Sequence, residues 1–403
     1  MTARGRSVLA LGLGVYAVAW VFGSRPLYPV ATGLVLAVAL AWAWVRLAAK
    51  PMHVRRHGGA REYLEGEDVE VTVEVEPTST VLPPSLACTE RPGRLGARQV
   101  DLRRKGRRLA GRYELTRVPR GRYGFEPVRL AVEDPFGLYR VELEAGEPQA
   151  LLVYPRLVEL DGLFSDGGSH ALEGRRVLLR RPSGFELHSV REYEQGESLR
   201  KVHWRSTARR GQLMVKELED APRDEVAVLL DGEAAAVAGE PPESTFDVQV
   251  RAAGSILRAL VHRNRRCVLV VNSALREVQE AHTGTADWRR ALELLALAEP
   301  TATVSAAALV APGAGTAGRA LELVVVTARM TGALADALVQ RHLSHRSVAV
   351  VYVDPLSFSG AAPRPEPLLL RLTAAGVPVA VVRRGDDLAA ALGSRPPAEA
   401  AGA

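Results

Sequence analysis

Cysteine and aromatic residues are scarce in this chain of 403 residues. Cys88 and Cys267 are the only cysteines and lie far apart, which excludes a disulfide framework and predicts two reduced, buried thiols. Aromatic residues make up 5% of the chain, too few for a surface on which nucleic-acid bases stack. The 52 Lys and Arg residues only slightly outnumber the 46 Asp and Glu residues, so the net charge of +6 does not indicate nucleic-acid binding either.

Motifs of the common catalytic sites are also missing from the sequence. No G-x-S-x-G nucleophile turn, H-E-x-x-H zinc motif, paired C-x-x-C or phosphate-binding G-x-x-x-x-G-K-[ST] occurs. These absences favour a protein without a catalytic centre.

Two long apolar runs lie near the N-terminus, from Ser7 to Phe22 and from Leu27 to Val45. The second run is close to the roughly 20 residues that a helix needs to cross a bilayer, and the first is slightly shorter. We expect residues 1–50 to form a transmembrane helical hairpin with spans at about 7–22 and 27–45.

The alternative is a cleaved signal peptide with Arg4 and Arg6 as its basic region. However, no small-x-small cleavage site ends the first run, and a second apolar run follows at once.

Basic residues flank the hairpin at its open end. Basic residues stay preferentially in the cytoplasm, so we expect both termini and the soluble body on the cytoplasmic side of the inner (plasma) membrane. The turn contains only Arg25, and the flanking basic residues are Arg4, Arg6, Arg46, Lys50, Arg55, Arg56 and Arg61.

Residues 61–156 have the period of β-strands. From Val69 to Glu76, valines alternate with Glu and Thr, which indicates a half-buried strand. Short strands between Pro and Gly residues predict a small antiparallel β-sandwich, and the turn Asp134-Pro135-Phe136-Gly137 is expected only to shape its sheet. The further predicted strands are Leu86–Glu90, Arg108–Leu115, Gly124–Val132, Tyr139–Leu143 and Leu151–Tyr154.

A Gly- and Arg-rich linker is expected at 157–182, an α/β domain at 183–393 and a disordered tail at 394–403. The α/β domain begins with a strand, a short helix that ends at Gly211 and an extended piece from Met214 to Leu218. The apolar run from Val226 to Leu230 then indicates a strand buried on both faces. Helices and strands alternate after it, which predicts a parallel sheet covered by helices, with a loop at Ala306–Arg319. The predicted helices are Phe246–His262, Asp287–Leu297, Leu334–His342 and Leu368–Ala375, and the predicted strands are Cys267–Val271, Leu321–Thr327, Val348–Val353 and Val377–Val382.

The stretch from Ser183 to Asp231 resembles the signature of the DUF58 family of bacterial proteins. It departs from the family pattern at Glu197 and His203, where Asp is usual in both places. The matching residues are Gly184, Arg191, Tyr193, Gly196, Arg200, Trp204, Ala208, Arg209 and Asp231.

The resemblance implies an α/β domain similar to the von Willebrand factor type A domain, whose members often bind Mg²⁺. Asp231 matches the first ligand, but Glu233 and Ala235 replace two serines, and no Asp follows Thr327 and Ala328. Mg²⁺ needs a near-octahedral set of oxygen ligands, so we expect a degenerate site without metal or cofactor. Asp231 would then cap the next segment or pair with a nearby Arg.

The resemblance also implies a function. We expect a membrane-anchored, non-catalytic adaptor that works beside a MoxR-type AAA+ ATPase in the assembly or maturation of protein complexes. Arg191, Arg200 and Arg209 would form ion pairs with neighbouring glutamates, and Trp204 would be a core or interdomain anchor. The alternative is a metal-dependent hydrolase that uses Asp231 and Glu233.

Overall fold

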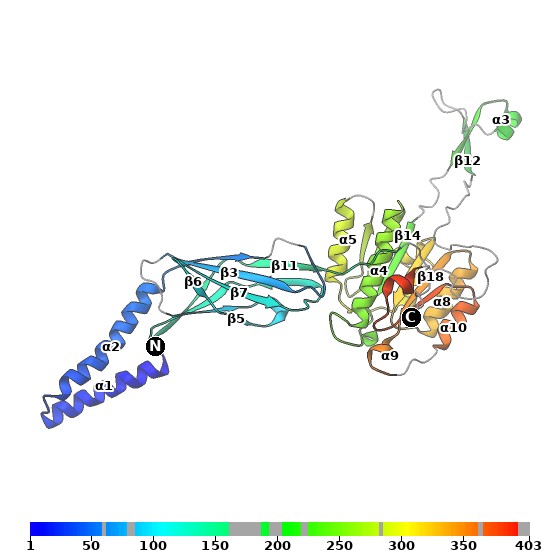
Figure 1. The fold of residues 1–403 in the computed structure, drawn as a ribbon. Coiled ribbons are helices and arrows are strands. Elements are labelled where there is room, and N and C mark those ends of the chain that lie inside the picture. The colour runs from blue at the N-terminus through cyan, green and yellow to red at the C-terminus, as the bar shows by residue number, and fades with distance from the viewer. Residues whose placement is uncertain are drawn as a thin grey trace, which may run out of the picture. The chain divides into compact units, whose positions relative to one another are not determined.

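The chain divides into two compact units, Met1–Tyr154 and Pro155–Ala403 (Figure 1). These are the N-terminal unit and the C-terminal unit. The structure, a computed structural model, describes residues 1–58, 62–78, 85–160, 187–192, 204–218, 225–281, 285–361 and 366–393.

Two apolar helices open the N-terminal unit, α1 (Ala3–Phe22) and α2 (Leu27–Ala48). Both predicted helices are confirmed, and each is long and apolar enough to cross a membrane. Helix α2 has 22 residues and therefore a length of roughly 33 Å, slightly more than the hydrocarbon thickness of a bilayer. Gly23 ends α1 with a φ of 62°, a conformation that glycine adopts without strain. The two helices lie side by side (Figure 1).

Three small sheets follow in the same unit. Their strand orders are β1-β3-β7-β6, β10-β9-β4-β5 and β2-β11-β8, and the pairs are antiparallel except β2 with β11. The elements are β1 (Met52–His57), β2 (Tyr63–Leu64), β3 (Val69–Pro77), β4 (Ser85–Glu90), η1 (Gly93–Leu95), β5 (Arg98–Val100), β6 (Arg103–Lys105), β7 (Arg108–Leu115), β8 (Gly121–Phe125), β9 (Val128–Glu133), β10 (Arg140–Ala145) and β11 (Gln149–Tyr154).

One hydrophobic core joins these sheets. Alternate residues of β3 are buried, as the valine pattern predicts, and they pack with residues of β4, β7, β9 and β11. Arg56 of β1 lies in this interior, where its Nε is 2.9 Å from Oε1 of the fully buried Glu90. The predicted single strand Gly124–Val132 is wrong, because Pro127 has no N–H for a ladder and separates β8 from β9.

The C-terminal unit is built on a six-stranded sheet with the order β16-β15-β14-β17-β18-β19. Its strands are β14 (Glu225–Asp231), β15 (Arg266–Asn272), β16 (Glu277–Ala281), β17 (Glu322–Thr327), β18 (Ser347–Val353) and β19 (Val379–Val382). Its helices are η3 (Ala234–Ala236), α4 (Thr245–His262), α5 (Thr285–Leu297), α6 (Ala306–Val310), α7 (Gly315–Arg319), α8 (Gly332–Leu343), α9 (Pro355–Phe358), α10 (Pro367–Ala374) and α11 (Leu388–Leu392).

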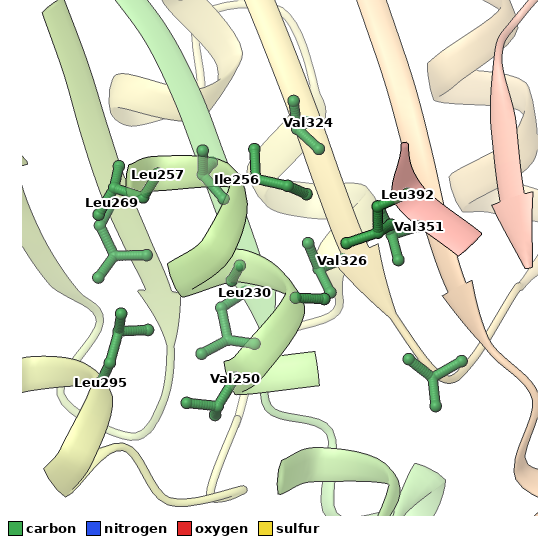
Figure 2. Close-up of a cluster of buried hydrophobic side chains, with 14 of the residues drawn as sticks. Leu230, Val250, Ile256, Leu257, Leu269, Leu295, Val324, Val326, Val351 and Leu392 are labelled. Carbon is green, nitrogen blue, oxygen red and sulfur yellow. The ribbon is translucent and has the colours of Figure 1, made fainter. Parts of the chain in front are cut away.

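Strand β14 is buried on both faces, which confirms the prediction from its unbroken apolar run. Val226, Val228 and Leu230 belong to one core cluster, with residues of α4, α5 and α11 (Figure 2). Ala227 and Leu229 belong to the opposite cluster, with residues of α6, α8 and α10. Two helical layers therefore enclose the strand and fix the position of its last residue.

The sheet differs from the prediction in two places. Strand β16 is antiparallel to β15 and forms one edge, so the sheet is mixed and not purely parallel. The predicted loop Ala306–Arg319 contains two short helices, α6 and α7, because Ala306, Val310 and Ala317 bury their small side chains in the second core. The body is thus a mixed α/β structure that follows two apolar helices.

A further antiparallel pair in the C-terminal unit consists of β12 (Leu187–Glu192) and β13 (Met214–Leu218). Helix α3 (Trp204–Arg210) precedes β13, and Gly211 follows the helix with a φ of 70°. The helix end predicted at Gly211 and the extended piece Met214–Leu218 are both confirmed.

Candidate functional site

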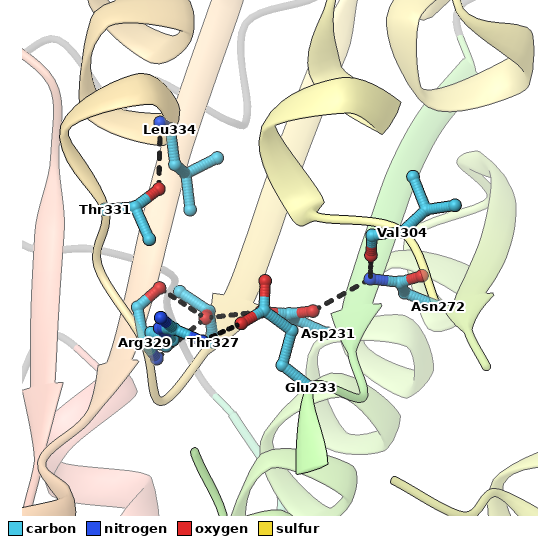
Figure 3. A network of polar contacts seen from close by, with 8 residues as sticks. All are labelled: Asp231, Glu233, Asn272, Val304, Thr327, Arg329, Thr331 and Leu334. Atoms are coloured by element: carbon cyan, nitrogen blue, oxygen red, sulfur yellow. Dashed lines mark hydrogen bonds and ion pairs between the residues drawn. The ribbon is translucent and has the colours of Figure 1, made fainter. Parts of the chain in front are cut away.

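Three neighbouring strands end in polar side chains that meet at one edge of the six-stranded sheet (Figure 3). Oδ1 of Asp231, the last residue of β14, accepts a hydrogen bond of 2.9 Å from Nδ2 of Asn272, the last residue of β15. Oδ2 of Asp231 accepts a hydrogen bond of 2.8 Å from the hydroxyl of Thr327, the last residue of β17. All three side chains are buried. The parallel register therefore gathers residues that are distant in sequence.

A second contact places an ion pair beside this group. Glu233 lies two residues after Asp231, and its Oε2 is 2.9 Å from Nη1 of Arg329. The backbone N–H of Arg329 donates to Thr327 Oγ1 across 3.0 Å, which ties the arginine to the same cluster. The ion pair is partly exposed at Arg329, so the cluster reaches the surface there.

The protonation of Asp231 reflects opposing effects. Burial is the largest, and it raises the pKa of the carboxyl above its ordinary value of 3.8. Hydrogen bonds from Thr327 and Asn272 lower the pKa in part, and the nearby charge of Glu233 raises it. A hydroxyl has a single hydrogen, and the Thr327 contact with Asp231 is shorter than its 3.1 Å contact with the carbonyl of Arg329. The hydrogen is therefore assigned to the bond with Asp231.

Gly232 permits the close approach of the chain after β14 to the end of β15. A Cβ at this position would lie 2.3 Å from the carbonyl oxygen of Asn272, which only glycine avoids. The Gly232 carbonyl also accepts a hydrogen bond of 2.9 Å from the N–H of Ala302. The sequence Asp-Gly-Glu thus holds Asp231 inside and directs Glu233 toward Arg329.

The position of the cluster is that of a ligand site in doubly wound folds. Strand β15 follows β14 on one side, and the chain then crosses to β17 on the other side. In open α/β sheets, ligands bind outside the carboxyl ends of the strands where the order reverses. Asp231 and Thr327 lie at this point, which makes the cluster the candidate site. Within the part of the chain that the structure describes, no group of three His, Cys, Asp or Glu side chains could hold a metal ion.

The predicted site residues have different outcomes. Asp231 is buried at the strand end, where its carboxylate accepts from Thr327, from Asn272 and from the backbone N–H of Glu233 in the next segment, and among the described residues it forms no ion pair with an Arg. Glu233 forms the ion pair instead. Asn272 and Arg329 were not predicted; the signal that could have found Asn272 is that a polar residue ends each of the three neighbouring strands β14, β15 and β17.

The family signature is only partly described. Trp204 has 66% of its surface exposed, so its assignment to a core is wrong, because α3 leaves the ring uncovered. Ala208 and Arg209 are exposed on the same helix, and Arg191 lies on β12. The other signature residues, Gly184, Tyr193, Gly196 and Arg200, lie outside the described residues.

Comparison with known proteins places the candidate site within a family. The model of the family described as "Protein of unknown function DUF58" matches residues 189–359, from β12 to just beyond α9. Residues 189–359 are a DUF58 region. The DUF58 region contains Asp231, Asn272 and Thr327 together with α3.

Individual relatives add little to this assignment. The chain is 31% identical over 120 residues to "Uncharacterized protein YeaD" of Bacillus subtilis (strain 168), a match that covers 30% of each chain. A solved structure, "Cwp6 from Clostridium difficile", matches with 9% identity and a TM-score of 0.20 over 74% of this chain and 37% of that chain. The chain thus spans less than half of the length of either protein.

Proposed function

We propose that this protein is a membrane-anchored, non-catalytic adaptor that works beside a MoxR-type AAA+ ATPase in the assembly or maturation of protein complexes. In this proposal the C-terminal unit is similar to a von Willebrand factor type A domain and presents a protein-binding surface. Helices α1 and α2 anchor the chain in the inner membrane, with both termini and the soluble units in the cytoplasm. The doubly wound strand order is compatible with such a domain, and the proposed ATPase comes from the family resemblance.

One observation supports a non-catalytic role above others. The polar groups at the switch point are paired with one another: Asp231 accepts from Thr327 and Asn272, and Glu233 accepts from Arg329. The Arg329 guanidinium supplies positive charge beside Glu233, where a metal-dependent enzyme would need an open acidic group. Such a cluster stabilises the carboxyl ends of the strands. Partner proteins would then bind to the surface around the cluster.

Apolar surface on α1 and α2 supports the anchor. Large apolar side chains on both helices are exposed, among them Trp20, Phe22 and Leu36. A bilayer would cover them. The topology is tested with protease added to spheroplasts, which should leave the C-terminal unit intact until the membrane is lysed.

The adaptor role is tested through Trp204, an exposed aromatic side chain in the DUF58 region. The full chain is purified in detergent with and without ATP, and the co-purifying proteins are identified by mass spectrometry. Trp204→Ala should lose an AAA+ ATPase that the unchanged chain retains, at an unchanged melting temperature. Leu275→Ala is the matched control, because Leu275 is an apolar residue with 80% of its surface exposed elsewhere in the C-terminal unit. An ATPase retained equally by all three chains would exclude Trp204 from the contact.

A metal-dependent hydrolase is the second candidate, and one observation favours it. Oδ1 of Asn272 is buried without a hydrogen-bond partner among the described residues, while the amide nitrogen of the same side chain faces the carboxylate of Asp231 (Figure 3). Rotation of this amide would turn the oxygen toward Asp231, where it would join Asp231 and Glu233 as a ligand. A rise of several degrees in the melting temperature with Mg²⁺ or Mn²⁺, absent in Asp231→Ala, would favour this candidate. The adaptor proposal expects no such rise.

A further inference from the structure

The turn between β9 and β10 holds an aromatic side chain away from its own sheet. Asp134 is buried, and its carboxylate accepts hydrogen bonds from the N–H groups of Phe136 at 2.9 Å and Tyr139 at 2.6 Å. Gly137 closes the turn with a φ of 67°. The turn is thus rigid and internally bonded, yet Phe136 has 75% of its surface exposed. A sheet-shaping role does not explain an aromatic residue at this position.

The same turn is fixed to the start of α1. The Thr2 N–H donates to the carbonyl of Leu138 at 3.1 Å, and the Thr2 hydroxyl donates to the carbonyl of Gly137 at 2.6 Å. A Cβ on Gly5 would lie 2.1 Å from the Leu138 carbonyl oxygen, so only glycine allows this approach. The Leu138 side chain packs with Val38 of α2. The turn therefore sits at the base of both helices, and these hydrogen bonds satisfy much of its backbone, as contact with lipid requires.

An apolar groove of about 620 Å³ lies between the turn and α2. It follows α2 from Ala37 to Leu47, eleven residues that rise by roughly 15 Å, which is about half the hydrocarbon thickness of a bilayer. Arg46 lies near the end of this stretch, with its guanidinium 5.8 Å from the ring centre of Trp42, an arrangement suited to the headgroup region. The residues that line the groove are Ala37, Leu40, Ala41, Ala43, Trp44, Leu47, Asp134, Pro135 and Phe136.

We propose that the turn Asp134–Gly137 is a third membrane-contacting element, in which Phe136 enters the bilayer and the groove beside α2 holds an acyl chain of a phospholipid. The inference rests on the proposed membrane anchoring by α1 and α2. The groove is continuous with the apolar surface of α2 and matches one leaflet in length. At that depth the bilayer supplies acyl chains, and a water-soluble partner could not reach the groove. The turn fixes the β-sheets of the N-terminal unit against the membrane surface.

Bilayer contact is tested by labelling single cysteines in the full chain with an environment-sensitive fluorophore. The variants Phe136→Cys, Leu36→Cys and Glu147→Cys are placed in phosphatidylcholine vesicles that contain brominated acyl chains, which quench nearby fluorophores. Leu36 is an exposed residue in the middle of α2, and Glu147 lies beyond the far end of β10, roughly 20 Å from the turn. The native Cys88 and Cys267 are buried and do not compete for the label.

We expect quenching at positions 136 and 36 and none at 147. Quenching at 36 without quenching at 136 would overturn the membrane contact of the turn and leave the anchor intact. Absence of quenching at position 36 would contradict the membrane anchoring by α1 and α2, and with it the membrane contact of the turn.

The groove is tested by counting phospholipids retained by the full chain in native mass spectrometry. Ala37→Trp places a large ring in the groove, whereas Ala39→Trp places it on an exposed position of α2 outside the lining residues. Loss of a bound phospholipid in the first variant only is the expected result. Equal retention in both variants would contradict the groove as the lipid site.

Discussion

The Thr327 hydroxyl donates to Oδ2 of Asp231 across 2.8 Å and joins the ends of β17 and β14 at the switch point of the sheet. Both side chains are buried, so water cannot take the place of either hydrogen-bond partner unless the carboxyl ends of the two strands separate. This bond holds the carboxyl ends of the two strands together at the candidate site.

Thr327→Val should loosen the carboxyl ends of β14 and β17. Valine keeps the shape of threonine but removes the hydrogen-bond donor, and loss of one partner of a buried polar group costs roughly 1–3 kcal/mol. Hydrogen exchange on peptides that cover the two strands should accelerate by about tenfold to a hundredfold. Thr327→Ser keeps the hydroxyl and serves as the control. Equal exchange in the two variants would show that the hydroxyl is unimportant.

The stability of the C-terminal unit should depend on pH through Asp231. Burial raises the pKa of Asp231 in the folded state above its ordinary value of 3.8. As pH rises through the ordinary value, the unfolded state loses its proton first, so the free energy of unfolding falls until the folded carboxyl also ionises. Asp231→Asn removes this dependence and can still accept from Asn272. The melting temperature of the Asn variant relative to the unchanged chain should therefore be higher near neutral pH than at about pH 4. A difference independent of pH would contradict the raised pKa.

Gly232→Ala should destabilise the same edge. The added Cβ would lie 2.3 Å from the Asn272 carbonyl oxygen, so the chain after β14 must shift. Overpacking of this kind costs typically about 1–3 kcal/mol. Gly332→Ala is the matched control, since a Cβ on Gly332 meets nothing within 4 Å at the first position of α8. The denaturation midpoint of Gly232→Ala should be lower than that of Gly332→Ala. Equal midpoints would show that the chain after β14 can shift without loss of stability.

Much of the fold follows from patterns that are local in sequence. The alternating valines of β3 and the unbroken run of β14 each specify a strand and its buried faces, and the two apolar runs specify α1 and α2. The candidate site was only half predictable. Asp231 and Glu233 are adjacent to a strong strand, whereas Asn272 and Arg329 join them only because the sheet register brings distant strand ends together. The core assignment of Trp204 was wrong because it assumed that so large a ring would be buried, and the structure leaves the ring exposed, whereas its alternative role as an interdomain anchor stays a prediction.

The two cysteines should resist thiol reagents in the folded chain. Burial raises the pKa of Cys88 to about 12 and that of Cys267 to about 12, so almost no reactive thiolate exists at neutral pH. Mass spectrometry after treatment with a maleimide should find no modification until denaturant is added, and two modifications afterwards. Rapid labelling of either cysteine without denaturant would mean that its part of the core opens readily.

Two neighbouring side chains of the β9–β10 turn should differ in their effect on stability. Leu138 is 7% exposed and packs between α1 and α2, so Leu138→Ala should cost roughly 2–3 kcal/mol. Phe136 is 75% exposed in the N-terminal unit, and Phe136→Ala should change stability in detergent by less than about 0.5 kcal/mol. Hydrogen exchange on peptides from β9 and β10 measures both effects locally. If Phe136→Ala were the more damaging change, the Phe136 ring would serve the packing of the unit and would not be free to enter the bilayer.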